Sequence, residues 1–315
     1  MQELHNIDCL EWLASRPPNS LHAVCTDPPY GLVEFSATEI LKLRTGKGGI
    51  WRIPPEFDGK KRNPLPRFSI LTPEQRSALG TYFRQWAELL LPALVPGAHV
   101  LIATNPVLHP HVSHGLLEAG LEPRGALMRI YHGFRGGDRP KNAELEFPDL
   151  CVSPRGNYEP WLLFRKPLSE KTVAQNLRKW GFGALRMLSG GRPVPDVIPS
   201  SKTPEVEKKI ADHPSLKPQQ LLRLFCRMLM PNAGILIDPF MGSGSTIAAC
   251  AALKQESIGL EIDPEYYALA HRAIPQLAEL YPYYQGEHLA MNAHDPITPN
   301  HRQLGLFTEE VEQIA

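Results

Sequence analysis

The sequence GILIDPFMGSGST, residues 234–246, decides the fold of this 315-residue chain. An apolar run ends at Asp238, and a turn of small residues then leads into a helix expected at residues 247–253. A second apolar strand, expected at residues 257–260, ends in Glu261. Strand, turn, helix and strand in this order predict a βαβ unit, and therefore an α/β fold built on a parallel sheet.

The turn also limits the kind of ligand. Its small residues let a ligand approach the backbone, and the helix start offers unpaired N–H groups. Glu261 lies roughly 20 positions past the glycines, where an acidic residue can hold ribose hydroxyls. A dinucleotide site would have glycine in place of Ile247, and a phosphate loop would have a lysine. The turn therefore suits a ribose-bearing ligand without pyrophosphate, such as S-adenosylmethionine. The alternative is a purely structural turn with Glu261 in solvent.

A second motif, TDPPY at residues 26–30, follows an apolar strand expected at residues 21–25. The two prolines end that strand, which places Asp27 at the carboxyl edge of the sheet. The Asp27 carboxylate and the Pro28 carbonyl can accept the N–H hydrogens of an exocyclic amine on a flipped-out base, and Tyr30 can stack on its ring. The structural alternative is a Pro–Pro turn in which Asp27 binds local amides.

Together these motifs resemble those of the amino-directed DNA methyltransferases, which use S-adenosylmethionine to methylate N6 of adenine or N4 of cytosine. The segment at residues 27–30 resembles their Asp-Pro-Pro-Tyr element, and residues 240–244 resemble their Phe-x-Gly-x-Gly element. Ser245 stands where the family usually has threonine, which keeps the hydroxyl. The catalytic motif precedes the cofactor motif, as in the circularly permuted beta class. The resemblance covers most of the chain and implies a Rossmann-like fold, with helices on both faces of a twisted, mostly parallel sheet.

The resemblance extends to the flanking segments. Residues 6–10 resemble the segment whose acidic residue meets the cofactor adenine, and residues 213–218 resemble a His-Pro-x-x-Lys-Pro segment before a cofactor-packing helix. Residues 92–103 resemble a helix, Pro-Gly turn and strand, and residues 158–166 resemble a later strand. The implied catalytic residues are Asp27, Pro28, Pro29 and Tyr30. The implied cofactor-binding residues are Asp8, Cys9, Lys217, Pro218, Asp238, Phe240, Gly242, Ser243, Gly244, Ser245, Thr246, Glu261 and Asp263.

The same layout predicts the organisation of the chain. Residues 1–166 would form the catalytic half with a basic insertion at residues 31–71, and residues 213–284 the cofactor half. Target recognition is expected at residues 167–212, where a helix is predicted at residues 170–180. Formal net charge is zero, so double-stranded DNA must bind through local basic patches. The candidate phosphate contacts are Lys47, Arg52, Lys60, Lys61, Arg62, Arg135, Arg139, Lys141, Arg178 and Lys179.

Other functional classes find less support in the sequence. The five cysteines are scattered without a Cys-x-x-Cys pair, so neither a zinc site nor a disulfide framework is expected. His109, His111 and His114 lack the spacing of a zinc helix and are expected at a solvated helix start. The zinc signature of nucleobase deaminases is absent. The chain shows no signal peptide, and its most apolar stretch is broken by proline and glycine, so we expect a cytoplasmic protein with no membrane span.

The end of the chain, residues 285–315, is expected to be a flexible tail. Its segment Gln303-Leu304-Gly305-Leu306-Phe307 resembles the Gln-Leu-x-Leu-Phe peptides that dock on the bacterial sliding clamp. The four candidate contacts are Gln303, Leu304, Leu306 and Phe307. The alternative is that these apolar side chains pack on the protein's own surface.

The sequence thus predicts an S-adenosylmethionine-dependent DNA methyltransferase. Asp27 resembles the adenine-N6 enzymes, since serine is commoner at that position in the cytosine-N4 enzymes, which remain the first alternative. An RNA methyltransferase and a non-catalytic nucleic-acid-binding protein also stay open. Protein glutamine methyltransferases favour asparagine at that position and the opposite motif order. The beta-class resemblance suggests a homodimer, and the sequence reveals neither the recognition sequence nor a restriction partner.

Overall fold

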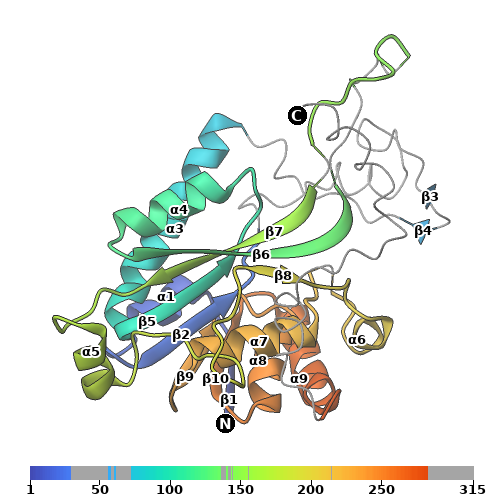
Figure 1. Cartoon of the computed structure of the whole chain (residues 1–315). Helices are drawn as coiled ribbons and strands as arrows, with labels where there is room; N and C mark the ends of the chain where they lie inside the picture. The colour runs from blue at the N-terminus through green and yellow to red at the C-terminus, as the bar shows by residue number, and fades with distance from the viewer. Residues whose placement is uncertain are drawn as a thin grey trace, which may run out of the picture.

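A computed structural model describes residues 1–29, 56–57, 60–61, 72–135, 140, 143, 145–154, 156–213 and 215–282, without the side chains of residues 56–57, 60–61 and 131–135. Most of its strands form one eight-stranded sheet, drawn in Figure 1. The strands in spatial order are β1 (Gln2–Asn6), β10 (Glu256–Glu261), β9 (Ile235–Asp238), β2 (Leu21–Thr26), β5 (Leu94–Ala103), β7 (Gly156–Arg165), β6 (Glu122–Arg135) and β8 (Val197–Pro199). A separate antiparallel pair joins β3 (Glu56–Phe57) to β4 (Lys60–Lys61).

The sheet is mostly parallel, as predicted. Along the eight-stranded sheet, β1, β10, β9, β2 and β5 pair in parallel, and so do β6 and β8. Of the strands described in this sheet, β7 alone runs antiparallel to its neighbours, β5 and β6. β2 pairs with β9 on one side and with β5 on the other, so segments that lie more than 200 residues apart in the chain become neighbours.

The central strands are buried on both faces and read as continuous apolar runs. Every residue of β5 is buried, and β2 is buried except at His22. Such runs are typical of parallel sheets covered by helices on both sides. Figure 1 shows α3 (Pro73–Ala93) and α4 (His109–Glu118) on one side of the sheet. It shows α7 (Gln219–Leu229), α8 (Ser245–Ala252) and α9 (Pro264–Glu279) on the other.

The long helix α3 shows how the local sequence sets an element. Thr72 and Gln75 form a reciprocal capping box at its start, and Pro73 occupies the first turn, where no amide donor is needed. Its inward face carries Phe83, Trp86 and other apolar side chains that are almost fully buried. Pro92 lies in the last turn of the helix, which ends at Ala93, and β5 begins at the next residue, Leu94.

The other helices in the described part of the chain have six to eight residues. They are α1 (Cys9–Ala14), α5 (Val173–Trp180) and α6 (Glu205–Ile210). α4 begins at His109, as predicted, and His114 lies on its exposed surface. Pro96 and Gly97 were expected in a turn but lie inside β5, because Gly97 adopts a φ of +85° without leaving the strand. Among the described helices, none is both long and apolar enough to cross a bilayer.

Candidate functional site

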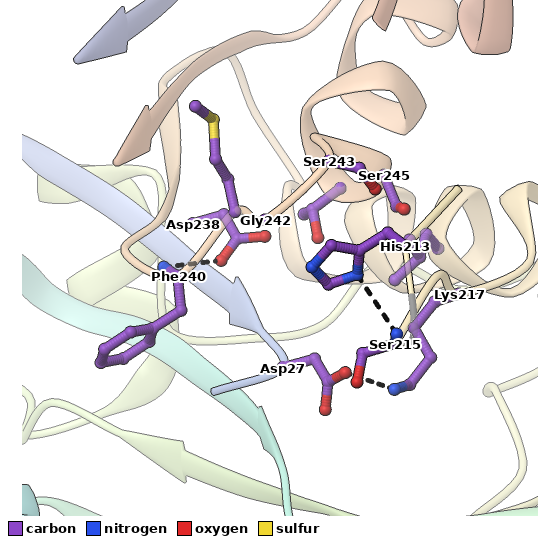
Figure 2. Close-up of a pocket in the computed structure, with 12 residues that line it drawn as sticks. Asp27, His213, Ser215, Lys217, Asp238, Phe240, Gly242, Ser243 and Ser245 are labelled. Carbon is purple, nitrogen blue, oxygen red and sulfur yellow. Dashed lines mark hydrogen bonds and ion pairs between the residues drawn. The ribbon is translucent and has the colours of Figure 1, made fainter. Parts of the chain in front are cut away.

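The carboxyl ends of β2 and β9 lie side by side and bring the two predicted motifs together. Thr26, the last residue of β2, donates its hydroxyl hydrogen to Asp238 Oδ1 over 2.6 Å, and both side chains are buried. A pocket opens beside them (Figure 2). Its lining combines both motifs with the segment before α7: Asp27, His213, Ser215, Lys217, Leu222, Asp238, Phe240, Met241, Gly242, Ser243, Ser245 and Thr246.

The glycine turn forms one wall of this pocket. Gly244 is the N-cap of α8 and has a φ of +83°, a conformation that side chains rarely adopt. A Cβ there would lie 2.5 Å from the Cγ1 of Ile274. Gly242 has a φ of +52°, and its amide donates to Glu261 Oε2 over 2.8 Å. Glu261 therefore holds the turn in place, while its Oε1 accepts the amide of Asp263 over 2.9 Å.

Asp238 stands at the base of the turn. Its Oδ1 accepts the amide of Phe240 over 3.2 Å as well as the Thr26 hydroxyl. Burial raises the pKa of Asp238 to about 6, even though its hydrogen bonds from Thr246, Thr26 and Phe240 act in the opposite direction. The Asp27 carboxylate adds to the rise. The pocket thus contains a buried carboxyl, Asp238, at the base of the turn.

Asp27 is held by a buried lysine. Lys217 Nζ pairs with Asp27 Oδ2, and it also lies 3.4 Å from Glu159 Oε1. Burial alone would lower the pKa of Lys217, but the two carboxylates outweigh burial and raise it. Lys217 is therefore an ammonium cation at neutral pH.

Glu159 extends this charged cluster across β7 and β6. Its Oε2 accepts from Arg129 Nη1 and from Trp161 Nε1, each over 3.1 Å. Burial opposes its ionisation, yet Lys217 and Arg129 together lower the pKa of Glu159 to about 2. Arg129 also donates to the Ser200 hydroxyl and the Ser201 carbonyl, each over 3.1 Å. The side chains of Asp27, Lys217, Glu159 and Arg129 thus form one continuous network, the charged cluster, in which only Asp27 is partly exposed.

His213 closes the pocket on the side of the turn. Its Nδ1 accepts the amide of Ser215 over 3.2 Å, and its ring packs edge-on against Tyr266 with 4.5 Å between centroids. Burial, assisted by Lys217, lowers the pKa of His213 to about 4, so the imidazole is neutral at pH 7. Because Nδ1 is the acceptor, Nε2 carries the proton. A Cβ at Gly242 would lie only 2.9 Å from this nitrogen.

Other predicted cofactor residues have structural contacts. Asp8 caps α1 by accepting the Leu10 amide over 2.7 Å, and Asp263 caps α9 through Oδ1. Cys9 is buried, its Sγ lies 3.6 Å from Tyr82 Oη, and burial raises its pKa to about 12. Phe240 packs against Trp86 and Tyr82. Pro218 is buried at the N-cap of α7, Pro28 is buried, and Pro29 is exposed.

The predicted recognition region is divided between two edges of the sheet. Asn176 in α5 donates to the carbonyl of Pro96 over 2.9 Å, so α5 packs near the amino end of β5. Asp27 follows Thr26, which pairs with Ile102, six residues further along β5 and therefore towards the opposite end of that strand. Arg178 and Lys179 in α5 thus lie far from the pocket, and Lys179 pairs with Glu170 at 2.5 Å. Ser200 and Ser201, directly after β8, contact Arg129 of the charged cluster.

Several predicted contacts lie outside the described residues. They are Tyr30, the basic residues Lys47, Arg52, Arg62, Arg139 and Lys141, and the tail residues Gln303, Leu304, Leu306 and Phe307. Lys60 and Lys61 form β4, and Arg135 ends β6, but their side chains are not described. Within the described part of the chain, no group of three or more His, Cys, Asp or Glu side chains is arranged to hold a metal ion.

Sequence reasoning missed Glu159, Arg129 and His213 as site residues. Glu159 carried a signal, since it is an acidic residue directly before an apolar run in the predicted strand. Arg129 carried none that separated it from the many basic residues around it. His213 lies in the segment that resembled the family, but its place against Gly242 depends on a contact between distant parts of the chain.

Comparison with known proteins agrees with this geometry. Residues 21–272 match the family model of N6/N4 DNA methylases. The Type II methyltransferase M2.DpnII of Streptococcus pneumoniae is 30% identical over 271 residues, which cover 85% of this chain and 87% of that protein.

Two solved structures share the fold. TTHA0409 of Thermus thermophilus, solved in complex with S-adenosyl-L-methionine, has a TM-score of 0.55 at 19% identity and covers 89% of this chain and 96% of its own. The cytosine-N4-specific PvuII DNA methyltransferase has a TM-score of 0.56 at 15% identity, with 88% and 91% covered. These likenesses establish the fold of the chain.

Proposed function

Because the chain belongs to the family of N6/N4 DNA methylases, we propose that it transfers a methyl group from S-adenosyl-L-methionine to the N6 amine of a flipped adenine in double-stranded DNA. The observation that carries the proposal is the meeting of the two motifs. Asp27 and the turn at residues 240–246 line one pocket, although they lie more than 200 residues apart in sequence. A methyl donor beside the turn is thus within reach of an amine at Asp27.

The pocket suits this cofactor in its chemistry. Gly242 lines the pocket, and Ser243, Ser245 and Thr246 add hydroxyl groups beside it that can bind a nucleoside. Asp238, at the base of the turn, supplies a negative charge that a sulfonium group favours. Glu261 already accepts two amides, and each of its oxygens can accept one more hydrogen bond, as ribose binding requires.

The residues of this chain would divide the work as follows. The bound cofactor supplies an electrophilic methyl group. Asp27 and the Pro28 carbonyl accept the two N–H hydrogens of the target amine, which localises the nitrogen lone pair. The Asp27 carboxylate then stabilises the positive charge that develops on the nitrogen, until that nitrogen loses a proton to water. Neither a metal ion nor a covalent bond between enzyme and substrate is required in this scheme.

Adenine is proposed as the target because Asp27 occupies the first position of the motif. Mass spectrometry of nucleosides from DNA treated with the protein distinguishes the two bases. N6-methyladenine is expected, whereas N4-methylcytosine would show that the target base is cytosine. An Asp27→Ala variant should lose methylation while keeping its affinity for the cofactor.

Two further assays separate the remaining classes. A non-catalytic DNA-binding protein would bind DNA but give no heat with S-adenosyl-L-methionine in calorimetry. An RNA methyltransferase would lose activity to structured RNA competitor more readily than to duplex DNA. The proposal expects cofactor binding in the first assay and competition by DNA in the second.

A further inference from the structure

The ammonium of Lys217 lies between two carboxylates with different tasks. On one side it pairs with Asp27, which is the proposed partner of the target amine. On the other side it lies 3.4 Å from Glu159, on the neighbouring part of β7. Its side chain is only 9% exposed, so the ammonium has lost most of its water and depends on these two partners. Figure 2 shows Lys217 pointing towards Asp27 and away from the glycine turn.

This arrangement controls the orientation of Asp27. An aspartate at the end of a strand can rotate about its terminal side-chain bond, and that bond has broad preferences. A cation fixed at Oδ2 restricts the rotation. This restriction matters for a carboxylate that must accept a hydrogen bond in one direction, because a displacement of about 1 Å from productive geometry lowers the rate roughly 100-fold.

A cation beside the reacting nitrogen also has a disadvantage. The nitrogen becomes positively charged as it gains a methyl group, and Lys217 alone would repel that charge. Glu159 offsets the repulsion because it lies against the other side of Lys217, and Arg129 keeps Glu159 ionised and fixed. The charged cluster contains two carboxylates and two cations, so its formal charge is balanced.

We propose that Lys217 is a positioning residue that orients Asp27 for the target amine, held in place by Glu159, and that it does not bind the cofactor. The inference replaces the role in cofactor binding that the sequence pattern suggested for Lys217. It rests on the proposed function, because it requires Asp27 to hold the amine. It also extends the site to Glu159 and Arg129, neither of which lines the pocket.

The test compares the turnover rate with the affinity for the cofactor. Lys217→Met keeps the length of the side chain and removes its charge. We expect kcat for DNA methylation to fall about 100-fold, with the Kd for S-adenosyl-L-methionine changed less than about threefold in calorimetry. Lys208→Met is the matched control, because Lys208 is an exposed lysine that pairs with Glu205 on its own helix. It should behave like the parent protein.

Chemical rescue separates positioning from a general loss of structure. In Lys217→Ala, added methylammonium can enter the space left by the side chain and donate to Asp27. We expect it to restore at least about tenfold of the lost rate, whereas tetramethylammonium, which has the same charge but no N–H donor, should not. If Lys217→Met does not fold, Glu159→Gln is the second variant, and its kcat should fall about tenfold with an unchanged Kd for the cofactor.

The outcomes are distinct. A raised Kd for the cofactor with kcat preserved would assign Lys217 to cofactor binding and overturn the inference. The inference would also be overturned if both ammonium ions restored the rate equally, or if neither ion restored it in a folded variant. A parent protein that does not methylate DNA, or an Asp27→Ala variant as active as the parent, would instead refute the proposed function.

Discussion

Thr26 and Asp238 join the two halves of the site through a single hydrogen bond of 2.6 Å between neighbouring strands. Thr26 precedes the proposed catalytic carboxylate, and Asp238 precedes the glycine turn. Both side chains are buried, so no water can replace either partner. The relative position of the two motifs therefore depends on this contact as well as on the pairing of β2 with β9.

Replacing Thr26 by valine tests this link. The substitution keeps the branched shape but removes the hydroxyl, which leaves Asp238 with one donor fewer. We expect the free energy of unfolding to fall by about 1–3 kcal/mol and kcat to fall with it. Denaturant titration and steady-state assays measure the two effects. Thr26→Ser keeps the hydroxyl and should retain most of both, and equal losses in the two variants would contradict the role of the hydrogen bond.

The stability of the protein should depend on the ionisation of Asp238. Its pKa rises from an ordinary value near 3.8 to about 6 on folding, so the unfolded state releases this proton more readily. The contribution of Asp238 to stability is therefore complete below pH 4 and is lost as pH rises towards and through 6. The full change amounts to about 3 kcal/mol.

Unfolding of Asp238→Asn provides the comparison. The asparagine does not titrate, so its free energy of unfolding relative to the parent should improve by that amount between pH 4 and pH 7. A difference that stays constant over this range would show that Asp238 has an ordinary pKa in the folded protein.

Gly244 and Gly190 form a matched pair for testing the turn. Both have a φ near +85°, at +83° and +88°, but only at Gly244 would a Cβ meet Ile274. Gly190→Ala should cost about 1 kcal/mol for its backbone conformation, whereas Gly244→Ala should cost about 2–4 kcal/mol and weaken cofactor binding. Thermal unfolding and calorimetry give both values. Similar costs in the two variants would mean that the contact with Ile274 relaxes freely.

Glu261 stabilises the glycine turn by accepting backbone amides, so its replacement should affect the turn as well as any bound ligand. In Glu261→Gln, only one side-chain oxygen remains, so either Gly242 or Asp263 loses its acceptor. We expect the Kd for S-adenosyl-L-methionine to rise at least about tenfold, with a loss of stability of about 1 kcal/mol. Unchanged binding would exclude Glu261 from the cofactor site.

Arg178 offers a test of the position of the DNA. It lies on α5, near the amino end of β5, while Asp27 lies at the opposite edge of the sheet. Arg178→Ala should therefore leave the Kd for duplex DNA within about twofold, and its salt dependence unchanged. A clear loss of affinity, together with a smaller salt slope, would show that DNA reaches around the sheet to α5.

The sequence predicted the fold well because its signals were local. The apolar runs of β2, β9 and β10, the glycine turn and the start of α4 at His109 all depend on neighbouring residues. The likeness to solved structures confirms the architecture. The site residues remain predictions, although Asp27 and most of the turn share one pocket, as expected.

Contacts between distant residues could not be predicted in this way. Lys217 lines the pocket, as expected, but its pairing with Asp27, which lies 190 residues earlier, was not predicted. The basic residues of α5 looked suitable for DNA, and the hydrogen bond from Asn176 to the carbonyl of Pro96, which holds that helix near the amino end of β5, was not predicted. The amino-acid composition of these two segments does not indicate these partners, because the contacts form only when the chain folds.

The strand order has a consequence for folding during synthesis on the ribosome. β2 is made early, but its partner β9 emerges more than 200 residues later, and β1 finds its place only after β10 has been synthesised. Closing such long loops is slow. A nascent chain that ends before residue 235 therefore lacks the neighbour of its catalytic strand, so premature termination cannot release a working enzyme fragment.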